Sequence, residues 1–184
     1  PLPVPAGPGT LGNSVETGNT ACGDPVTISN GNMYHQFTDI VLAGPTYPLS
    51  LDRTYNSQAA AIDSPFGFGW SHRYQASVTV QGDDLVYVTR SGSALRFTAQ
   101  GAEYRSAMAP ATRLIRDADG FRLIAPDGFV SRFDSSGRLI SLADANANTH
   151  ILAYDSAGHL LSVSSGAGDT LTLSSDGHGR IVSA

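Results

Sequence analysis

The chain has 184 residues, of which 41% are hydrophobic, a share typical of a globular protein. Its net charge is −5, and all 11 basic residues are Arg, scattered singly from Arg53 to Arg180. A phosphate-binding face needs a clustered basic stripe, so this pattern disfavours nucleic acid as a partner. No apolar run approaches the roughly 18–20 residues that a membrane helix needs, and we expect no membrane span. Cys22 is the only cysteine, which excludes an internal disulfide.

Residues 1–24 are rich in Pro, Gly, Thr and Asn and have no apolar period. This composition predicts an extended lead-in or linker rather than a folded element. The first five residues lack the basic and apolar regions of a signal peptide. Cys22, near the end of this segment, is interpreted as a small residue packed at the start of the first strand, with an intermolecular disulfide as the alternative.

From Pro25 onward, short runs of β-branched and aromatic residues alternate with turns of Gly, Asn, Asp and Ser. This is the pattern of consecutive antiparallel β-hairpins. Dipeptides such as Asn30-Gly31 and Gly82-Asp83 supply the positive φ angles that tight hairpins need. Further turns of this kind are predicted at Ser91-Gly92, Gln100-Gly101, Asp119-Gly120, Asp127-Gly128 and Ser136-Gly137.

The predicted fold class is therefore all-β, an open sheet of consecutive hairpins. We expect a first β-domain over residues 25–110 and a set of repeat strands over residues 111–184. Only the Ala-rich segment at residues 58–62 predicts a helical turn, which Pro65 ends.

A repeat of about 21 residues occupies the last third of the chain. Its turn glycines, Gly137, Gly158 and Gly179, are equally spaced. The three units read Phe133-Asp134-Ser135-Ser136-Gly137-Arg138-Leu139, Tyr154-Asp155-Ser156-Ala157-Gly158-His159-Leu160 and, in a worn form, Ser175-Asp176-Gly177-His178-Gly179-Arg180-Ile181.

Each unit predicts a two-strand module that buries its apolar face only against a neighbour on either side. We expect the Asp of each unit to accept hydrogen bonds from turn amides, and the aromatic residue to pack onto the next module. The sequence stops just after the third turn, so we expect an uncapped sheet edge and a native polypeptide that continues beyond it.

These units resemble the YD repeats of Rhs proteins, whose pattern is Tyr-Asp-x-x-Gly-x-Leu, although Phe133 and Ser175 stand in place of the Tyr. The preceding region is similar to the domain before the repeats in that family, over residues 22–34, 49–57 and 66–72. Its more specific part is an Arg-Thr-Tyr-x-Ser motif followed by Gly-x-Gly-Trp-Ser. The motif residues are Arg53, Thr54, Tyr55, Gly69 and Trp70.

The resemblance covers residues 22–184 and implies one segment of a hollow β-shell of many YD repeats that encloses a C-terminal toxin or other cargo. Such proteins are secreted by bacteria or displayed on their surface, and some act in competition between bacteria. The chain lacks the family's C-terminal core and any toxin domain, so we expect a structural segment with no catalytic activity and no cofactor. The expected partners are the remainder of a larger polypeptide, further copies of the chain, and the cargo.

Two other patterns mimic functional sites. Asp144-x-Asn146-x-Asn148 resembles the opening of a calcium loop that would close at Asp155, but Thr149 stands where such a loop needs Gly. Turn capping is the favoured interpretation there, and also at Asp117-x-Asp119-Gly120. The histidines show no short metal-ligand spacing, so we expect no metal site. They are His35, His72, His150, His159 and His178.

Trp70-Ser71-His72 invites a nucleophile-and-base interpretation, which we reject because neighbouring residues on a strand point to opposite faces. Phe66, Phe68, Trp70, His72 and Tyr74 would share one face of a continuous strand. Such a stripe is interpreted first as core packing. Facing outward it would instead stack on sugars, which leaves a carbohydrate-binding or adhesive module as an alternative. A self-assembling extracellular filament is a further alternative, in which other copies cover the open edge.

Overall fold

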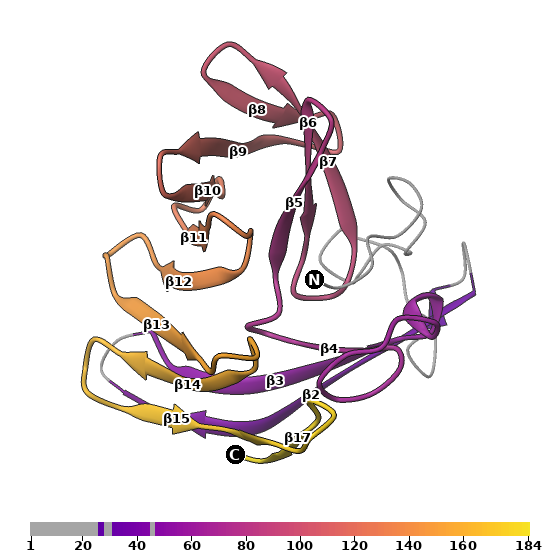
Figure 1. Cartoon of the computed structure of the whole chain (residues 1–184), viewed down its shortest axis with the longest axis vertical. Coiled ribbons are helices and arrows are strands. Elements are labelled where there is room, and N and C mark those ends of the chain that lie inside the picture. Colours follow the sequence, from indigo (N-terminus) through magenta and orange to yellow (C-terminus); the bar gives the residue numbers. More distant parts are fainter. Residues whose placement is uncertain (1–25, 28–30, 45–46) are drawn as a thin grey trace.

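The computed structural model describes residues 26–27, 31–44 and 47–184. The described chain is nearly all antiparallel β-strand, as the sequence predicts (Figure 1). A 3-10 turn, η2 (Ser57–Ala59), forms at the start of the Ala-rich segment where a helical turn is expected. Asn56 caps η2 by accepting a hydrogen bond from the backbone N–H of Gln58.

Four strands form the first sheet, in the order β1 (Val26–Thr27), β2 (Asn32–Leu42), β3 (Leu49–Asn56) and β4 (Trp70–His72). β2 and β3 pair over most of their length, with a bulge between Thr38 and Ile40. Leu49 and Leu51 of β3 are buried in the core. This face of the sheet therefore lies against the rest of the molecule.

Eleven strands form the second sheet, and their order in space follows their order in the chain. Each strand therefore pairs with the next through a short turn, which confirms the predicted hairpins. The strands are β5 (Ser77–Gln81), β6 (Asp84–Val88), β7 (Ala94–Gln100), β8 (Glu103–Ser106), β9 (Ala109–Asp117), β10 (Gly120–Ile124), β11 (Val130–Asp134), β12 (Leu139–Ala143), β13 (Thr149–Tyr154), β14 (Leu160–Ser165) and β15 (Thr170–Thr172).

The glycine of each predicted turn dipeptide has a positive φ angle, and those from Gly82 onward lie at hairpin connections. Gly82, with φ +63°, closes the β5–β6 hairpin as expected. The predicted boundary between residues 110 and 111 falls inside β9, and one core runs through both parts of the chain. A separate hairpin of β16 (Ser174–Ser175) and β17 (Ile181–Ser183) follows β15.

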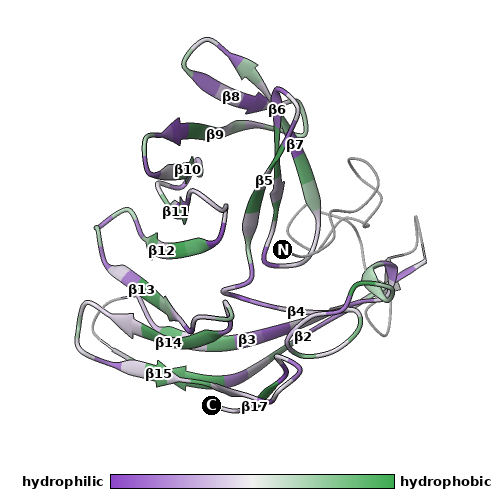
Figure 2. Ribbon diagram, viewed as in Figure 1, coloured by the Kyte–Doolittle hydropathy of each residue, from purple (hydrophilic) through white to green (hydrophobic). Residues whose placement is uncertain are grey.

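The eleven-stranded sheet curls, so that β5 in the centre of Figure 1 returns beside the turn between β11 and β12. The backbone N–H of Val78 donates to the carbonyl oxygen of Gly137 at 2.8 Å. The inner face is apolar, and across it the rings of Tyr87 and Phe133 lie 6.1 Å apart, edge to face. Green residues recur along β5, β7, β12 and β14 in Figure 2, consistent with the buried Val78, Phe97, Leu139 and Val163.

The curl leaves no room for a side chain at Gly137. Its φ is +81°, and a Cβ there would overlap the carbonyl group of Val78, 2.8 Å from the carbonyl carbon. Gly101 also has a positive φ, but a Cβ there would meet no atom within 4 Å. The two positions separate the cost of backbone strain from the cost of a steric clash.

We predict that Gly101→Ala lowers the free energy of unfolding by roughly 1–2 kcal/mol, the cost of a left-handed backbone alone. Gly137→Ala should lower it by about 3 kcal/mol or more, because β5 must also move away from the turn. Urea denaturation of both variants measures the difference. Equal losses of stability would contradict the close approach of β5 to the turn.

Candidate functional site

The three repeat turns share one geometry. In the first, Asp134 Oδ1 accepts from the backbone N–H of Ser136 and of Arg138, each at 3.0 Å. The backbone N–H of Gly137 donates to the Asp134 carbonyl oxygen at 2.9 Å. The Asp of each unit therefore satisfies backbone donors within its own turn.

The second and third turns repeat this pattern. Asp155 Oδ1 accepts from the N–H of His159 at 2.8 Å, and Asp176 Oδ1 accepts from that of Arg180 at 2.9 Å. These backbone hydrogen bonds hold the pKa of both carboxyls below the usual range. At neutral pH the carboxylates are therefore charged and committed to their turns.

Successive turns also lie against one another. Gly158 faces the Arg138 side chain, whose Nη1 would lie 3.6 Å from a Cβ at Gly158. Gly179 faces the His159 ring, where a Cβ would lie 2.7 Å from Nε2. The side chain that follows each turn glycine thus covers the glycine of the next unit, which gives the 21-residue spacing a physical cause.

The aromatic residue of the second unit packs on the preceding unit. The Tyr154 hydroxyl donates to the Leu139 carbonyl oxygen at 2.7 Å, and the Arg138 guanidinium lies 4.4 Å from the ring centroid. Packing onto the next module was the wrong expectation for Tyr154. Because β13 pairs with β12, a ring at the end of β13 reaches back to the first residue of β12. The leucines of the two units, Leu139 and Leu160, are buried in the core.

The Arg-Thr-Tyr and Gly-Trp motifs lie together because β3 and β4 are paired, with Tyr55 opposite Trp70 and Thr54 opposite Ser71. Gly69 has φ +77°, and a Cβ there would lie 2.8 Å from Tyr55 Cε2. The glycine therefore lets the chain pass close to the tyrosine ring on its way into β4.

Arg53 connects the strands of this sheet. Its Nη2 donates to Asp39 Oδ1 at 2.7 Å, and its Cζ lies 5.1 Å from the Trp70 ring and 5.4 Å from the Phe66 ring. Residues 66–69 form a turn, so the predicted aromatic stripe along one strand does not form. Phe68 is 59% exposed, whereas Tyr74 is buried.

A cleft of about 410 Å³ lies between residues 72–79 and the column of repeat turns. Its walls are mostly apolar, with Arg138 and His159 as polar groups on the turn side. The repeat-unit residues that line it include Gly137, Tyr154, Gly158, Leu160 and Gly179. The remaining wall includes Pro65, His72, Val78 and Ile181.

Several polar side chains that the sequence patterns single out make structural contacts. The Ser71 hydroxyl donates to the Thr54 carbonyl oxygen at 3.4 Å, and His72 Nδ1 accepts from the backbone N–H of Tyr74 at 3.4 Å. Asp144 Oδ1 accepts from the N–H of Asn146 and of Asn148 at 2.8 and 2.9 Å, so it caps a turn. Among the described residues, no three His, Cys, Asp or Glu side chains gather as metal ligands would. Cys22 and the lead-in lie outside the described residues.

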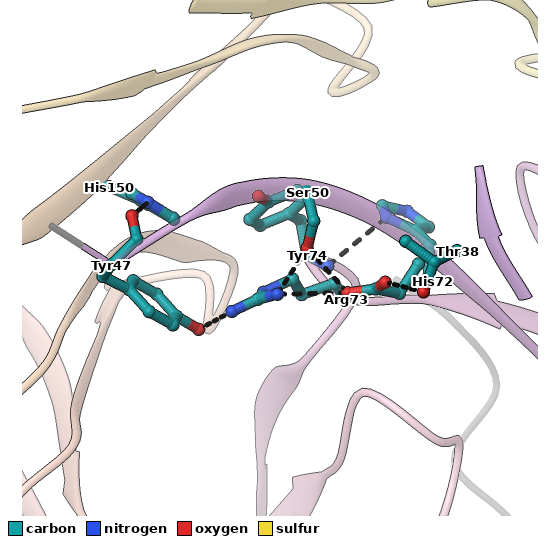
Figure 3. A network of polar contacts seen from close by, with 8 residues as sticks. Thr38, Tyr47, Ser50, His72, Arg73, Tyr74 and His150 are labelled. Atoms are coloured by element: carbon teal, nitrogen blue, oxygen red, sulfur yellow. Dashed lines mark hydrogen bonds and ion pairs between the residues drawn. The ribbon is translucent and has the colours of Figure 1, made fainter. Parts of the chain in front are cut away.

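A polar contact that the sequence does not predict joins the connection before β3 to the repeat strands, through Tyr47 and His150 (Figure 3). His150 of β13 places Nε2 3.2 Å from the Tyr47 carbonyl oxygen, and the two rings stack with centroids 4.6 Å apart. Arg73 joins the same contact at the Tyr47 ring. Its Cζ lies 4.6 Å from the ring centroid, and its Nη1 lies 3.0 Å from Asp52 Oδ2. The one available signal is that His150 shares strand parity with the buried Leu152.

Burial lowers the pKa of both His72 and His150 to about 4. An unfolded histidine binds its proton near pH 6.5, so proton uptake favours the unfolded chain as pH falls below that value. The stability that the neutral rings contribute is thus complete above about pH 6.5 and is lost toward pH 4. The capping aspartates, whose pKa values are lowered, affect stability only at more acidic pH.

We predict that the melting temperature falls steadily from pH 7 to pH 4.5, because the buried histidines oppose protonation. His150→Gln keeps an N–H donor near Tyr47 and should flatten this dependence, while His178→Gln, at an exposed turn position, should leave it unchanged. Thermal unfolding followed by circular dichroism measures all three. A melting temperature that stays constant from pH 7 to pH 5 would contradict the assigned burial.

Residues 23–97 match a family model described as "Domain of unknown function (DUF6531)". The match covers the first sheet and the strands up to most of β7, and stops before the repeat units. No curated protein matches the chain. Over the residues that the structure describes, none of the helical segments has the length and apolarity to cross a membrane.

Proposed function

We propose that this chain is a structural, non-catalytic segment of a larger secreted bacterial YD-repeat protein, whose β-shell encloses a C-terminal toxin or other cargo. The stacked turn column is the observation that carries the proposal. The Arg or His that follows the turn glycine of one unit covers the turn glycine of the next unit. An array of this kind gains stability from its neighbours and extends by addition of like units.

Two further features support an architectural role. The capping aspartates accept hydrogen bonds within their own turns, and the Ser71 hydroxyl donates to a backbone carbonyl oxygen. The large sheet is curved (Figure 1), and one buried apolar core contains residues from β5 through to β15. In the described chain β15 pairs only with β14, which leaves its other edge as a place for a further strand.

The family match is consistent with this proposal without naming a function. The DUF6531 region supplies β1 to β6 and most of β7, and the first repeat turn packs against it at Val78. We therefore assign residues 23–97 the role of a starting platform on which the repeat array begins.

We predict that an antibody raised against this segment detects a secreted or surface-bound bacterial polypeptide many times larger than 19.2 kDa. Immunoblots of culture medium, envelope and cytosol from the source cells measure this directly. A strain in which the corresponding gene segment is deleted provides the control for antibody specificity. A native species of about the size of this chain would contradict the shell and favour a module that acts alone or self-assembles.

A further inference from the structure

The connection before β4 contains a turn that shares with the repeat turns a backbone hydrogen bond, a capping side chain and a glycine of positive φ, although its sequence differs. The backbone N–H of Gly67 donates to the Ser64 carbonyl oxygen at 2.9 Å, as Gly179 does to Asp176 at 3.0 Å. The Ser64 hydroxyl accepts from the N–H of Phe66 at 3.2 Å, two residues on. Gly67 has φ +105°. Ser64 thus makes the side-chain hydrogen bond to residue i+2 that Asp134 and Asp176 make in the repeat turns.

This turn also lies where a following unit would lie. Arg180 stands after the third turn glycine, and its Nη1 would lie 3.9 Å from a Cβ at Gly67. Arg138 bears the same relation to Gly158, at 3.6 Å. Each of the two arginines therefore covers a glycine of positive φ that belongs to the next turn.

The contacts around Arg180 show that the third turn is engaged by this connection. The Arg138 guanidinium pairs with Asp134 of its own turn, at 3.0 Å. The Arg180 guanidinium instead reaches Asp63 and the Ser64 carbonyl oxygen, and lies 5.7 Å from the Phe68 ring. The backbone N–H of Ile181 donates to the Pro65 carbonyl oxygen at 2.9 Å, which joins β17 to the connection.

We infer that residues 63–68 form a built-in cap, a turn that resembles a repeat turn. The cap covers the surface of the third repeat turn on which a following unit would pack. The surface consists of Gly179, Arg180 and Ile181, and the partner it fits is a turn of the Asp-x-x-Gly type. In the described chain the first turn of the column thus lies against Val78 and the third against Ser64, both in the region before the repeats. A further unit in a longer polypeptide would compete with the cap for this surface, a consequence that rests on the proposed function.

Hydrogen exchange of the Ile181 amide in the 184-residue chain tests the cap, because that N–H is bonded to the connection itself. Ser64→Ala removes the hydroxyl that orders the turn, and we expect Ile181 to exchange about five-fold faster, as for loss of a capping side chain. Ser64→Asp supplies the residue that the repeats use and should keep exchange within about two-fold of the parent rate. Ser141→Ala, on β12, is the matched control and should change nothing at Ile181.

Phe68→Ala provides a second variant at an exposed position, and it should also speed exchange at Ile181. Unchanged exchange in both Ser64→Ala and Phe68→Ala would overturn the inference. A Ser64→Asp variant as labile as Ser64→Ala would also overturn it, since the turn would then not obey the repeat rule. These outcomes concern the isolated chain, so they are independent of the size of the native protein that tests the proposed function.

Discussion

The approach of β5 to the first repeat turn is the constraint on which the rest of this structure depends. The Val78 amide bonds to the Gly137 carbonyl oxygen, and the space between the two backbones admits no side chain at Gly137. This contact turns a ribbon of hairpins into a curled sheet with an inner face. It also fixes the first turn of the column, against which the Gly158 and Gly179 turns stack in order.

The cleft and the buried histidines follow from this arrangement. Closing the curl brings residues 72–79 opposite the repeat turns, with an apolar space of about 410 Å³ between them. At the other end of β13, His150 packs on Tyr47, and burial there favours the neutral ring. The two halves of the chain are thereby joined by backbone contacts, ring stacking and a shared apolar core rather than by a linker.

The local structure could be predicted from sequence because it depends on short-range rules. Turn glycines such as Gly82 need positive φ, and alternating apolar residues specify strands. The equal spacing of Gly137, Gly158 and Gly179 identified the repeat. The curl could not be predicted, since nothing near Val78 or Gly137 in sequence records that the two meet. The cap was equally hidden, because Ser64 replaces the Asp that made the other turns recognisable.

Two expectations, the packing direction of Tyr154 and the aromatic stripe before β4, were wrong because they depend on how the strands pair and where the chain bends. Tyr154 packs backward because its strand pairs with β12, an order that depends on sheet topology and not on the motif. The aromatic stripe fails because Gly67 and Gly69 bend the chain before β4. Arg53 then lies beside the rings of Phe66 and Trp70, which gives these residues a structural role within the sheet.

Amide hydrogen exchange at Val78 is the most direct test of this account. Val78 lies on β5 at the edge of the eleven-stranded sheet, and its N–H points to the Gly137 carbonyl. If the curl is as described, this amide should exchange as slowly as the core of the sheet, near the limit set by global unfolding. Rapid exchange at Val78 beside slow exchange at its neighbours in β6 would contradict it, because β5 would then be a free edge and the column of turns would lack its base.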